Sequence, residues 1–244
     1  MGRAPALALS LLDGFELRVG DTSIPLAPGS QRLLAFVAVR EGRASKEAVF
    51  ATLWPESDRR RASGNLRSVL WRLPEHVRDA VEVGPSDVRL DPQVGCDVRA
   101  FVGLARRLIR GSLPGDTVDL RTLHHDLLPT WYDDWVLLER ERLRQLRMHA
   151  LESLAAALSD CGRFGEAIDA ALLAVAAEPL RESAHRRLVE AHVAEGNRSE
   201  AIRHFEHYRE LLADELGVEP SPGLRQLAYE PRAGATASAV GAGS

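Results

Sequence analysis

The first apolar positions of the chain alternate with polar ones. Phe15, Leu17 and Val19 fall on one side of this segment, and Glu16 and Arg18 fall on the other. Such a period of two is typical of a β-strand with one buried face. A second short strand-like segment follows the turn residues Gly and Asp at 20–21. The pattern therefore predicts a small antiparallel sheet at the start of the chain.

Three segments with helical spacing follow this sheet. Ser30 and Ser45 are the expected N-caps of the first two helices, and the third helix covers about 60–73. The segments 81–83 and 88–90 then have the pattern of a hairpin. Three helices followed by a hairpin is the order of a winged helix-turn-helix, in which the third helix enters the DNA major groove. The predicted core positions of the helices are Leu33, Leu34, Phe36, Val37, Val49, Phe50, Leu53, Leu66, Val69, Leu70 and Leu73.

The third predicted helix carries a dense positive charge. Its segment RRRASGNLRSVLWRL, 59–73, holds five arginines and no acid in a chain whose formal net charge is -4. Most charge runs are only the solvated face of an amphipathic helix. Here, however, the face opposite the core is centred on Gly64, Ser68 and Trp71. A glycine inside a helix costs about 1 kcal/mol relative to alanine, so this face favours a large partner that presses closely against it.

We interpret this face as a DNA-reading surface. Arg and Ser side chains can hydrogen-bond to base edges, an apolar side chain can touch a thymine methyl, and Arg and Lys can hold phosphates. The predicted base-reading residues are Gly64, Arg67, Ser68 and Trp71. The predicted phosphate contacts are Lys46, Arg60, Arg61, Arg72 and Arg89.

From Asp97 onward the pattern is almost entirely helical, with a first helix over about 97–110. Gly162 and Ala167 recur as Gly196 and Ala201, a step of 34 residues in both cases. This step is the period of a tetratricopeptide unit, whose small residues let paired helices approach closely. The repeat is degenerate, because the proline that ends the first copy has no counterpart in the second. The expected fold class is α+β, mostly α: a winged helix-turn-helix domain at 1–95, an all-α tetratricopeptide-like domain at 96–230 and a disordered tail at 231–244.

Composition and charge place the 244-residue chain among soluble globular proteins. Apolar residues make up 45% and charged residues 27%. The first apolar run is short and ends at Asp13, so we expect no signal peptide, no membrane partner and a cytoplasmic location. Cys96 and Cys161 lack the paired spacing of a zinc or redox site, and we expect both to be reduced. Residues 1–100 carry a net charge of +1 and residues 101–244 carry a net charge of -5, and this asymmetry favours a two-part function.

Three residue groups could carry other chemistry. The His-His-Asp run at 124–126 could serve a metal-dependent hydrolase or act as an acyl-transfer base, but no second ligand cluster has metal-site spacing. His204 and His207 lie three apart on a helix and could clip a metal, although surface histidines at this spacing are more often incidental. The aromatic residues of 131–135 favour helix packing over a ligand box. We therefore expect no catalytic residue, no metal and no cofactor, so the protein is not expected to be an enzyme.

Six motifs occur along the chain in a fixed order: GSQRLLAFVAV, LW at 53–54, NLRSVLWRL, CDVRAF, LLPTWYDDWVLLERERLRQLR and ELGVEPSPGL. In these motifs and their order, the chain resembles the SARP-type antibiotic regulatory proteins, transcription factors that join a winged helix to a bacterial transcriptional activator domain. The resemblance runs from about Leu7 to Leu227. It places the recognition helix at 62–73, where Arg67 and Arg72 match positions that the family keeps polar or basic. Many relatives have further basic residues after this helix, whereas this chain has Pro74 and a glutamate there. We therefore expect weaker contact with the DNA backbone at that end of the helix.

Two functions follow as hypotheses. The resemblance implies a sequence-specific DNA-binding regulator, an activator of a biosynthetic gene cluster that binds promoter direct repeats and contacts RNA polymerase. Tandem sites would also reward a homodimer on double-stranded DNA. The alternative is a tetratricopeptide-type adaptor whose winged helix binds a protein instead of DNA. A buried Trp71 would favour the adaptor, whereas the basic residues of the third helix favour DNA.

Overall fold

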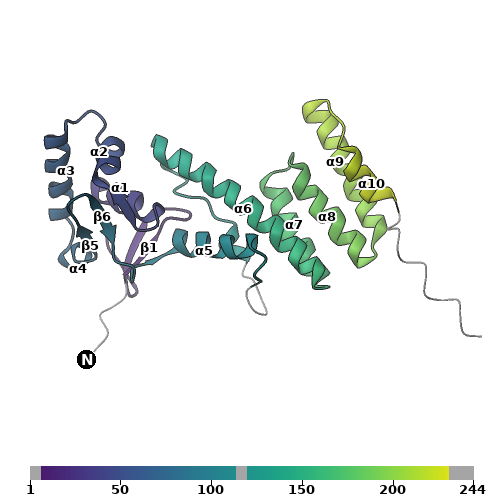
Figure 1. Cartoon of the computed structure of the whole chain (residues 1–244), viewed down its shortest axis with the longest axis horizontal. Coiled ribbons are helices and arrows are strands. Elements are labelled where there is room, and N and C mark those ends of the chain that lie inside the picture. The colour runs from purple at the N-terminus through teal and green to yellow at the C-terminus, as the bar shows by residue number, and fades with distance from the viewer. Residues whose placement is uncertain (1–6, 114–119, 231–244) are drawn as a thin grey trace, which may run out of the picture. The chain divides into compact units, whose positions relative to one another are not determined.

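The computed structural model describes residues 7–113 and 120–230, and its elements are labelled in Figure 1. Contacts divide the chain into two compact units. One unit comprises Met1–Arg106 and Arg121–Arg147, and the other comprises Arg107–Leu120 and Met148–Ser244. The predicted tail at 231–244 lies outside the described residues. The domain bounds predicted from the sequence stay a prediction, since this division places a later segment with the amino-terminal unit.

The amino-terminal unit begins with a four-stranded sheet of order β3-β2-β1-β7. Its strands at 16–19 and 22–23 pair antiparallel, as the alternating pattern predicts. A third strand at 7–10, which the pattern did not predict, pairs antiparallel with the first of these, and Leu9 stands opposite Leu17 with both side chains buried. The fourth strand pairs parallel to β1 and is only two residues long. The strands are β1 (Leu7–Ser10), β2 (Glu16–Val19), β3 (Thr22–Ser23) and β7 (Gly95–Cys96).

A winged helix-turn-helix follows β3, with its three main helices and hairpin in the predicted order. Its helices are α1 (Pro28–Val39), α2 (Lys46–Leu53), α3 (Arg59–Trp71) and the short α4 (Glu75–Arg78). Its strands are β4 (Arg43–Ser45), β5 (Val81–Val83) and β6 (Asp87–Leu90), which form an antiparallel sheet of order β4-β6-β5. The hairpin β5–β6 is the wing. All predicted core positions of the three helices are buried except Phe50 and Leu70, which are half-buried.

The helix caps agree with the sequence prediction at one of two positions. The Ser45 side chain accepts a hydrogen bond from the Ala48 amide at 3.1 Å and begins α2. The prediction that Ser30 caps α1 is wrong, because α1 begins at Pro28 after the N-cap residue Ala27. Proline suits the first turn of a helix, where its missing amide hydrogen is not needed. Ser30 is instead buried inside the helix and donates to the Val69 carbonyl at 3.4 Å.

A distant segment, Arg121–Arg147, completes the amino-terminal unit. Trp135 is 7% exposed and meets the Phe36 ring edge-on, with ring centroids 5.3 Å apart. Trp131 stacks on Phe15 at 6.1 Å, whereas Tyr132 is exposed. Two of the three aromatics in 131–135 therefore pack against the amino-terminal core.

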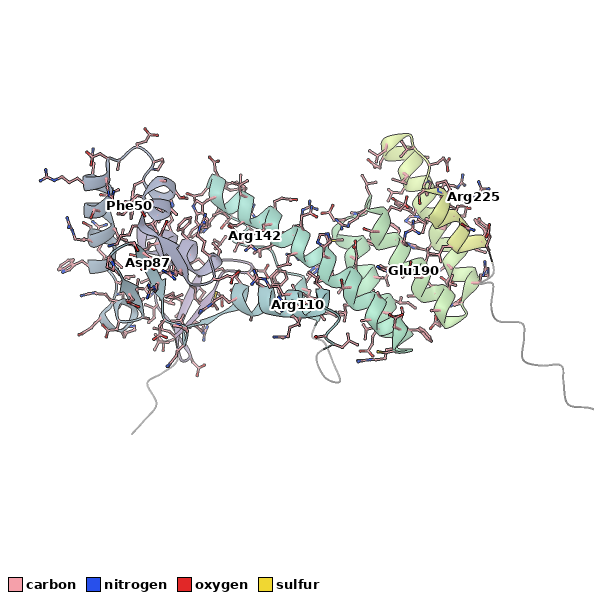
Figure 2. All side chains as sticks on the ribbon, in the orientation of Figure 1. Phe50, Asp87, Arg110, Arg142, Glu190 and Arg225 are labelled. Carbon is pink, nitrogen blue, oxygen red and sulfur yellow. The ribbon has the colours of Figure 1, made fainter. Side chains whose placement is uncertain are left out.

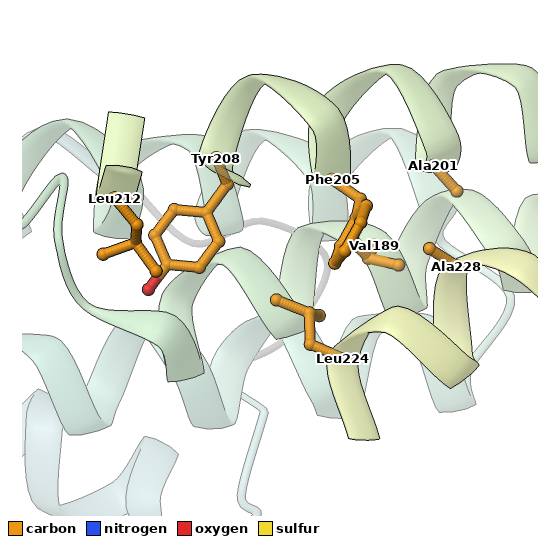
Figure 3. Packing of buried hydrophobic residues seen from close by; sticks show 7 residues of the cluster. All are labelled: Val189, Ala201, Phe205, Tyr208, Leu212, Leu224 and Ala228. Atoms are coloured by element: carbon orange, nitrogen blue, oxygen red, sulfur yellow. The ribbon is translucent and has the colours of Figure 1, made fainter. Parts of the chain in front are cut away.

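Small side chains hold the helices of the carboxy-terminal unit together. Ala167, Ala174 and Ala201 are fully buried, and Gly162 and Gly196 end helices with φ of 75° and 89°, a backbone region that favours glycine. The predicted helix repeat is thus present, and Figure 3 shows the core cluster around Phe205 and Tyr208. Its helices are α7 (Phe164–Ala177), α8 (Glu182–Glu195), α9 (Arg198–Leu216) and α10 (Pro222–Tyr229).

Two further helices, α5 (Asp97–Ile109) and α6 (Asp134–Asp160), run from one unit into the other, and η1 (Leu120–Leu123) is a short 3-10 helix between them. The five apolar positions that the helical spacing turns inward in α5 are all buried: Val98, Phe101, Val102, Ala105 and Leu108. Within the described ranges, every helix is too short or too polar to span a membrane.

Candidate nucleic-acid interface

The inward face of α3 is fixed by α1 and the core. Ala62, Leu66 and Val69 are buried, and α1 approaches so closely that a Cβ atom on Gly29 would lie 3.4 Å from Val69 Cγ2. Asp58 is the N-cap of α3, and its carboxylate accepts a hydrogen bond from the Arg61 amide at 2.7 Å. Because this side is anchored, the opposite face of α3 points away from the core, at the edge of the amino-terminal unit in Figure 1.

The outward face presents the three residues on which the sequence centres it. Trp71 is 78% exposed, so its indole is not packed beneath another element. A Cβ atom built on Gly64 would meet nothing within 4 Å. Ser68 is exposed, but its hydroxyl donates to the Gly64 carbonyl at 3.0 Å. The Ser68 oxygen is therefore left mainly as a hydrogen-bond acceptor.

Among the described residues, four arginines on α3 and at its end have no acidic partner. Arg60, Arg61, Arg67 and Arg72 are all exposed, and none forms an ion pair with another residue of 7–113 or 120–230. Arg59, by contrast, pairs with Glu47 at 3.2 Å. The structure thus brings the predicted base-reading residues and three of the predicted phosphate contacts onto one open, positively charged helix.

The other two predicted phosphate contacts lie at the wing. The Lys46 ammonium donates to the Pro85 carbonyl at 3.2 Å. Arg89 Nε donates to Asp87 Oδ2 at 3.0 Å, and Arg43 Nε donates to the same oxygen at 2.6 Å. Asp87 is labelled in Figure 2 and is 4% exposed. Both predicted wing cations already have protein partners, so they are less free than those of α3.

The wing carboxylate keeps its charge although it is buried. Burial raises the pKa of Asp87, but hydrogen bonds from Arg89 and Arg43 outweigh it, so the pKa lies below its ordinary value. A Cβ atom on Gly84 would come within 2.5 Å of Asp87 Oδ1, so a side chain at this position would displace the carboxylate that Arg43 and Arg89 hold. Arg43 and Arg89 stand directly opposite each other on β4 and β6. The carboxylate therefore bridges two like charges that would otherwise repel.

Sequence reasoning missed Arg78, which also lies at this interface. Its Nη2 donates to the Leu73 carbonyl at 2.9 Å and to the Trp71 carbonyl at 3.3 Å, at the end of α3. The available signal was a basic residue shortly after a predicted helix end, where such side chains often bond to the last carbonyls.

The His-His-Asp run at 124–126 makes structural contacts. The His125 Nδ1 atom contacts the Asp13 carboxylate, and Asp126 pairs with Arg147 at 3.0 Å. Each partner comes from a different part of the amino-terminal unit, so the run ties that unit together. In the part of the chain that the structure describes, no group of three or more His, Cys, Asp or Glu could hold a metal ion.

His204 pairs with a histidine of another helix and not with His207. His185 Nδ1 and His204 Nε2 are 2.9 Å apart, and His185 stacks on Tyr208 with ring centroids 3.8 Å apart. The other His185 ring nitrogen lies 2.7 Å from the Pro179 carbonyl oxygen. Burial lowers the pKa of His204 to about 4 and also lowers that of His185. The pair is therefore a neutral part of the helical core.

The two cysteines are unpaired with each other. Cys96 is half-buried and Cys161 is exposed, and both are free thiols. Burial raises the pKa of the Cys96 thiol, which favours its unreactive protonated form.

Comparison with known proteins identifies the family. Residues 96–230 match the bacterial transcriptional activator domain. The regulatory protein AfsR of Streptomyces coelicolor is 31% identical over 222 residues, which cover 86% of this chain and 22% of AfsR. The transcriptional regulatory protein MoaR1 of Mycobacterium tuberculosis is 25% identical over 93% of this chain and 79% of MoaR1. The chain therefore spans about a fifth of the length of AfsR but most of the length of MoaR1.

A solved structure shares the fold. The structure of Mycobacterium tuberculosis EmbR in complex with a low-affinity phosphopeptide matches with a TM-score of 0.71 and 23% identity, over 92% of this chain and 64% of that one. This likeness confirms the predicted fold class, α+β and mostly helical, with a winged helix before an all-α part. The matched domain, the relatives and the ordered motifs agree, and this chain belongs to the SARP-type family of transcriptional regulators with a bacterial transcriptional activator domain.

Proposed function

We propose that this protein is a sequence-specific DNA-binding transcriptional regulator. The α3 helix enters the major groove, and the wing reaches the neighbouring backbone. One observation carries the proposal: α3 and its end present four exposed arginines that have no acidic partner among the described residues, together with Trp71, which is 78% exposed, and the open Gly64. In a family of transcriptional regulators, a duplex is the polyanion that such a face fits best.

The contacts divide into base reading and phosphate binding. Gly64 allows the DNA close to the helix backbone, Arg67 and Trp71 meet base edges, and Ser68 accepts a hydrogen bond from a base amino group. Arg60, Arg61 and Arg72 hold phosphates beside the groove. Lys46 and Arg89 extend this grip at the wing, more weakly because each already donates to a protein oxygen.

The carboxy-terminal unit supplies the rest of the proposed activity. Following the family resemblance, we assign it to self-association and to contact with RNA polymerase at the promoter of a biosynthetic gene cluster. A homodimer bound to direct repeats gains avidity, because the second binding event becomes intramolecular. This suits a single winged helix, which makes only a few phosphate contacts by itself. Because promoters lie in the bacterial cytoplasm, this proposed function also implies a cytoplasmic location.

The alternative, a protein-binding adaptor, is less well supported. That function would use the tetratricopeptide-like repeats for one partner and the winged helix for another. An adaptor of this kind predicts that Trp71 is covered by a neighbouring element, whereas the indole is exposed. The unpaired arginines beside it also favour a polyanion over an ordinary protein surface.

The test is a titration of purified protein with two duplexes over a range of salt concentrations. One duplex carries the upstream region of the neighbouring genes, and the other is a shuffled sequence of equal length. Arg67→Ala should reduce the binding free energy for the first duplex by about 1–3 kcal/mol and relax the sequence preference at one base pair. Arg61→Ala should weaken binding to both duplexes alike, and it should reduce the slope of log affinity against log salt concentration by about one.

The outcomes separate the function from the residue roles. Wild-type protein that ignores both duplexes even in dilute buffer refutes DNA binding altogether. Wild-type protein that binds, with both variants indistinguishable from it, refutes only the assigned roles. Genomic footprinting then shows whether the bound sites are direct repeats at promoters.

A further inference from the structure

The carboxyl end of α3 needs a positive charge if it lies beside DNA. The last carbonyls of a helix lack intrahelical partners and carry partial negative charge, which repels phosphates. Arg72 is the last cation that α3 and its C-cap provide, because the residues that follow Leu73 are Pro74 and Glu75.

The short helix α4 brings a further cation, Arg78, to the carboxyl end of α3. The Pro74 carbonyl accepts hydrogen bonds from the Val77 and Arg78 amides at 3.0 and 2.9 Å, which closes one tight turn. This turn brings the Arg78 side chain back to the end of α3. Its Nη2 lies 2.9 Å from the Leu73 carbonyl and 3.3 Å from the Trp71 carbonyl.

Arg78 keeps both charge and donors for a second partner. A guanidinium has five N–H donors, and the two bonds to carbonyls use Nη2 alone. Arg78 is exposed, and within the described ranges its Nε and Nη1 atoms have no hydrogen-bond partner. The acids next to it in sequence, Glu75 and Asp79, are exposed but form no ion pair with it in that part of the chain.

We propose that Arg78 is a DNA phosphate contact that also positions the end of the recognition helix. One guanidinium nitrogen holds the carbonyls beside Trp71, and the others bind a phosphate of the same duplex. The proposal rests on the proposed DNA-binding function and adds a residue to its interface. Such a contact carries no base preference, so it should strengthen binding to every DNA sequence alike.

The test compares two substitutions that separate charge from helix capping. Arg78→Gln keeps an amide donor for the carbonyls and loses the charge, whereas Arg78→Lys keeps the charge. Loss of one phosphate contact weakens the affinity by a factor that scales with salt concentration to the power of about -0.9, which gives about 8-fold weaker binding at roughly 0.1 M salt and about 20-fold at roughly 0.03 M. We expect this pattern for Arg78→Gln on both the upstream and the shuffled duplex, and near wild-type binding for Arg78→Lys.

The control is Arg203→Gln, which removes an arginine with a 78% exposed side chain from α9. Binding by Arg78→Gln equal to that of this control overturns the proposal. So does equal weakening by Gln and Lys with an unchanged salt slope and a lower melting temperature, because that is the result of a capping role alone. If the wild-type protein binds no duplex, the DNA-binding function itself has failed, and the Arg78 contact falls with it.

Discussion

Replacing Gly64 with alanine should move stability and DNA affinity in opposite directions. Gly64 lies inside α3, where glycine is less favourable than alanine by about 0.8–1.0 kcal/mol. A Cβ atom at this position meets nothing within 4 Å, so the added methyl causes no crowding in the free protein. We therefore expect the free energy of unfolding to rise by about 1 kcal/mol, or roughly 4 °C in melting temperature for a unit of this size.

The same methyl should weaken DNA binding if the duplex approaches the helix backbone at this point. An atom that has free space in the unbound protein would then lie where a base edge or sugar must sit. We expect Gly64→Ala to reduce affinity for the upstream duplex severalfold, and Gly64→Leu to abolish specific binding, because the larger side chain extends further from the helix.

The assay pairs urea unfolding, followed by circular dichroism, with duplex titration of the same protein samples. Gly103→Ala is the matched control, since Gly103 also lies within a helix, in α5, with nothing within 4 Å of its Cβ position. It should gain similar stability and bind DNA as the wild type does. A Gly64→Ala protein that is more stable and binds equally well refutes the close-approach role. A destabilised Gly64→Ala protein refutes the reasoning about free space.

Two further predictions concern the carboxy-terminal unit. Burial lowers the pKa of His204 to about 4 from its ordinary value near 6.5, so between these pH values the unfolded state binds the proton more strongly and stability falls as pH decreases. Between pH 7 and pH 4.5, the free energy of unfolding measured with urea should fall by about 2 kcal/mol more in the wild type than in His204→Gln. Equal decreases in the two proteins would contradict a His204 ring that burial keeps neutral. Ala201→Leu should cost about 1–3 kcal/mol or more by overfilling a fully buried helix contact, whereas Ala213→Leu at an exposed position should change little; equal melting temperatures for the two variants would contradict this packing.

Local periodicity was enough to predict the main elements and the open face of α3. Leu66 and Val69 turn inward at helical spacing, which puts Trp71 outside, and the structure has it exposed. The cap at Ser45 was also predictable, because its side chain and the helix start are adjacent in sequence. Ser30 was not the cap of α1, since Pro28 offers an earlier start that a serine-based rule overlooks.

Contacts between distant or irregular segments could not be predicted in the same way. The strand β7 is two residues long and has no period to detect. The packing of Trp135 on Phe36 joins residues that no local pattern relates. His204 pairs with His185 from α8, whereas spacing along one helix pointed to His207. Arg78 reaches α3 only because the single turn of α4 bends the chain back.

The order in which the chain visits its two units limits how this architecture can be divided. The amino-terminal unit takes its residues from two stretches, and the stretch between them, Arg107–Leu120, belongs to the other unit. A single cut near residue 95 would strip Trp135 from Phe36, and it would remove the Asp97 carboxylate that accepts the Leu11 and Leu12 amides. Recombination that exchanges winged helices between such regulators must therefore carry the later stretch along with the winged helix.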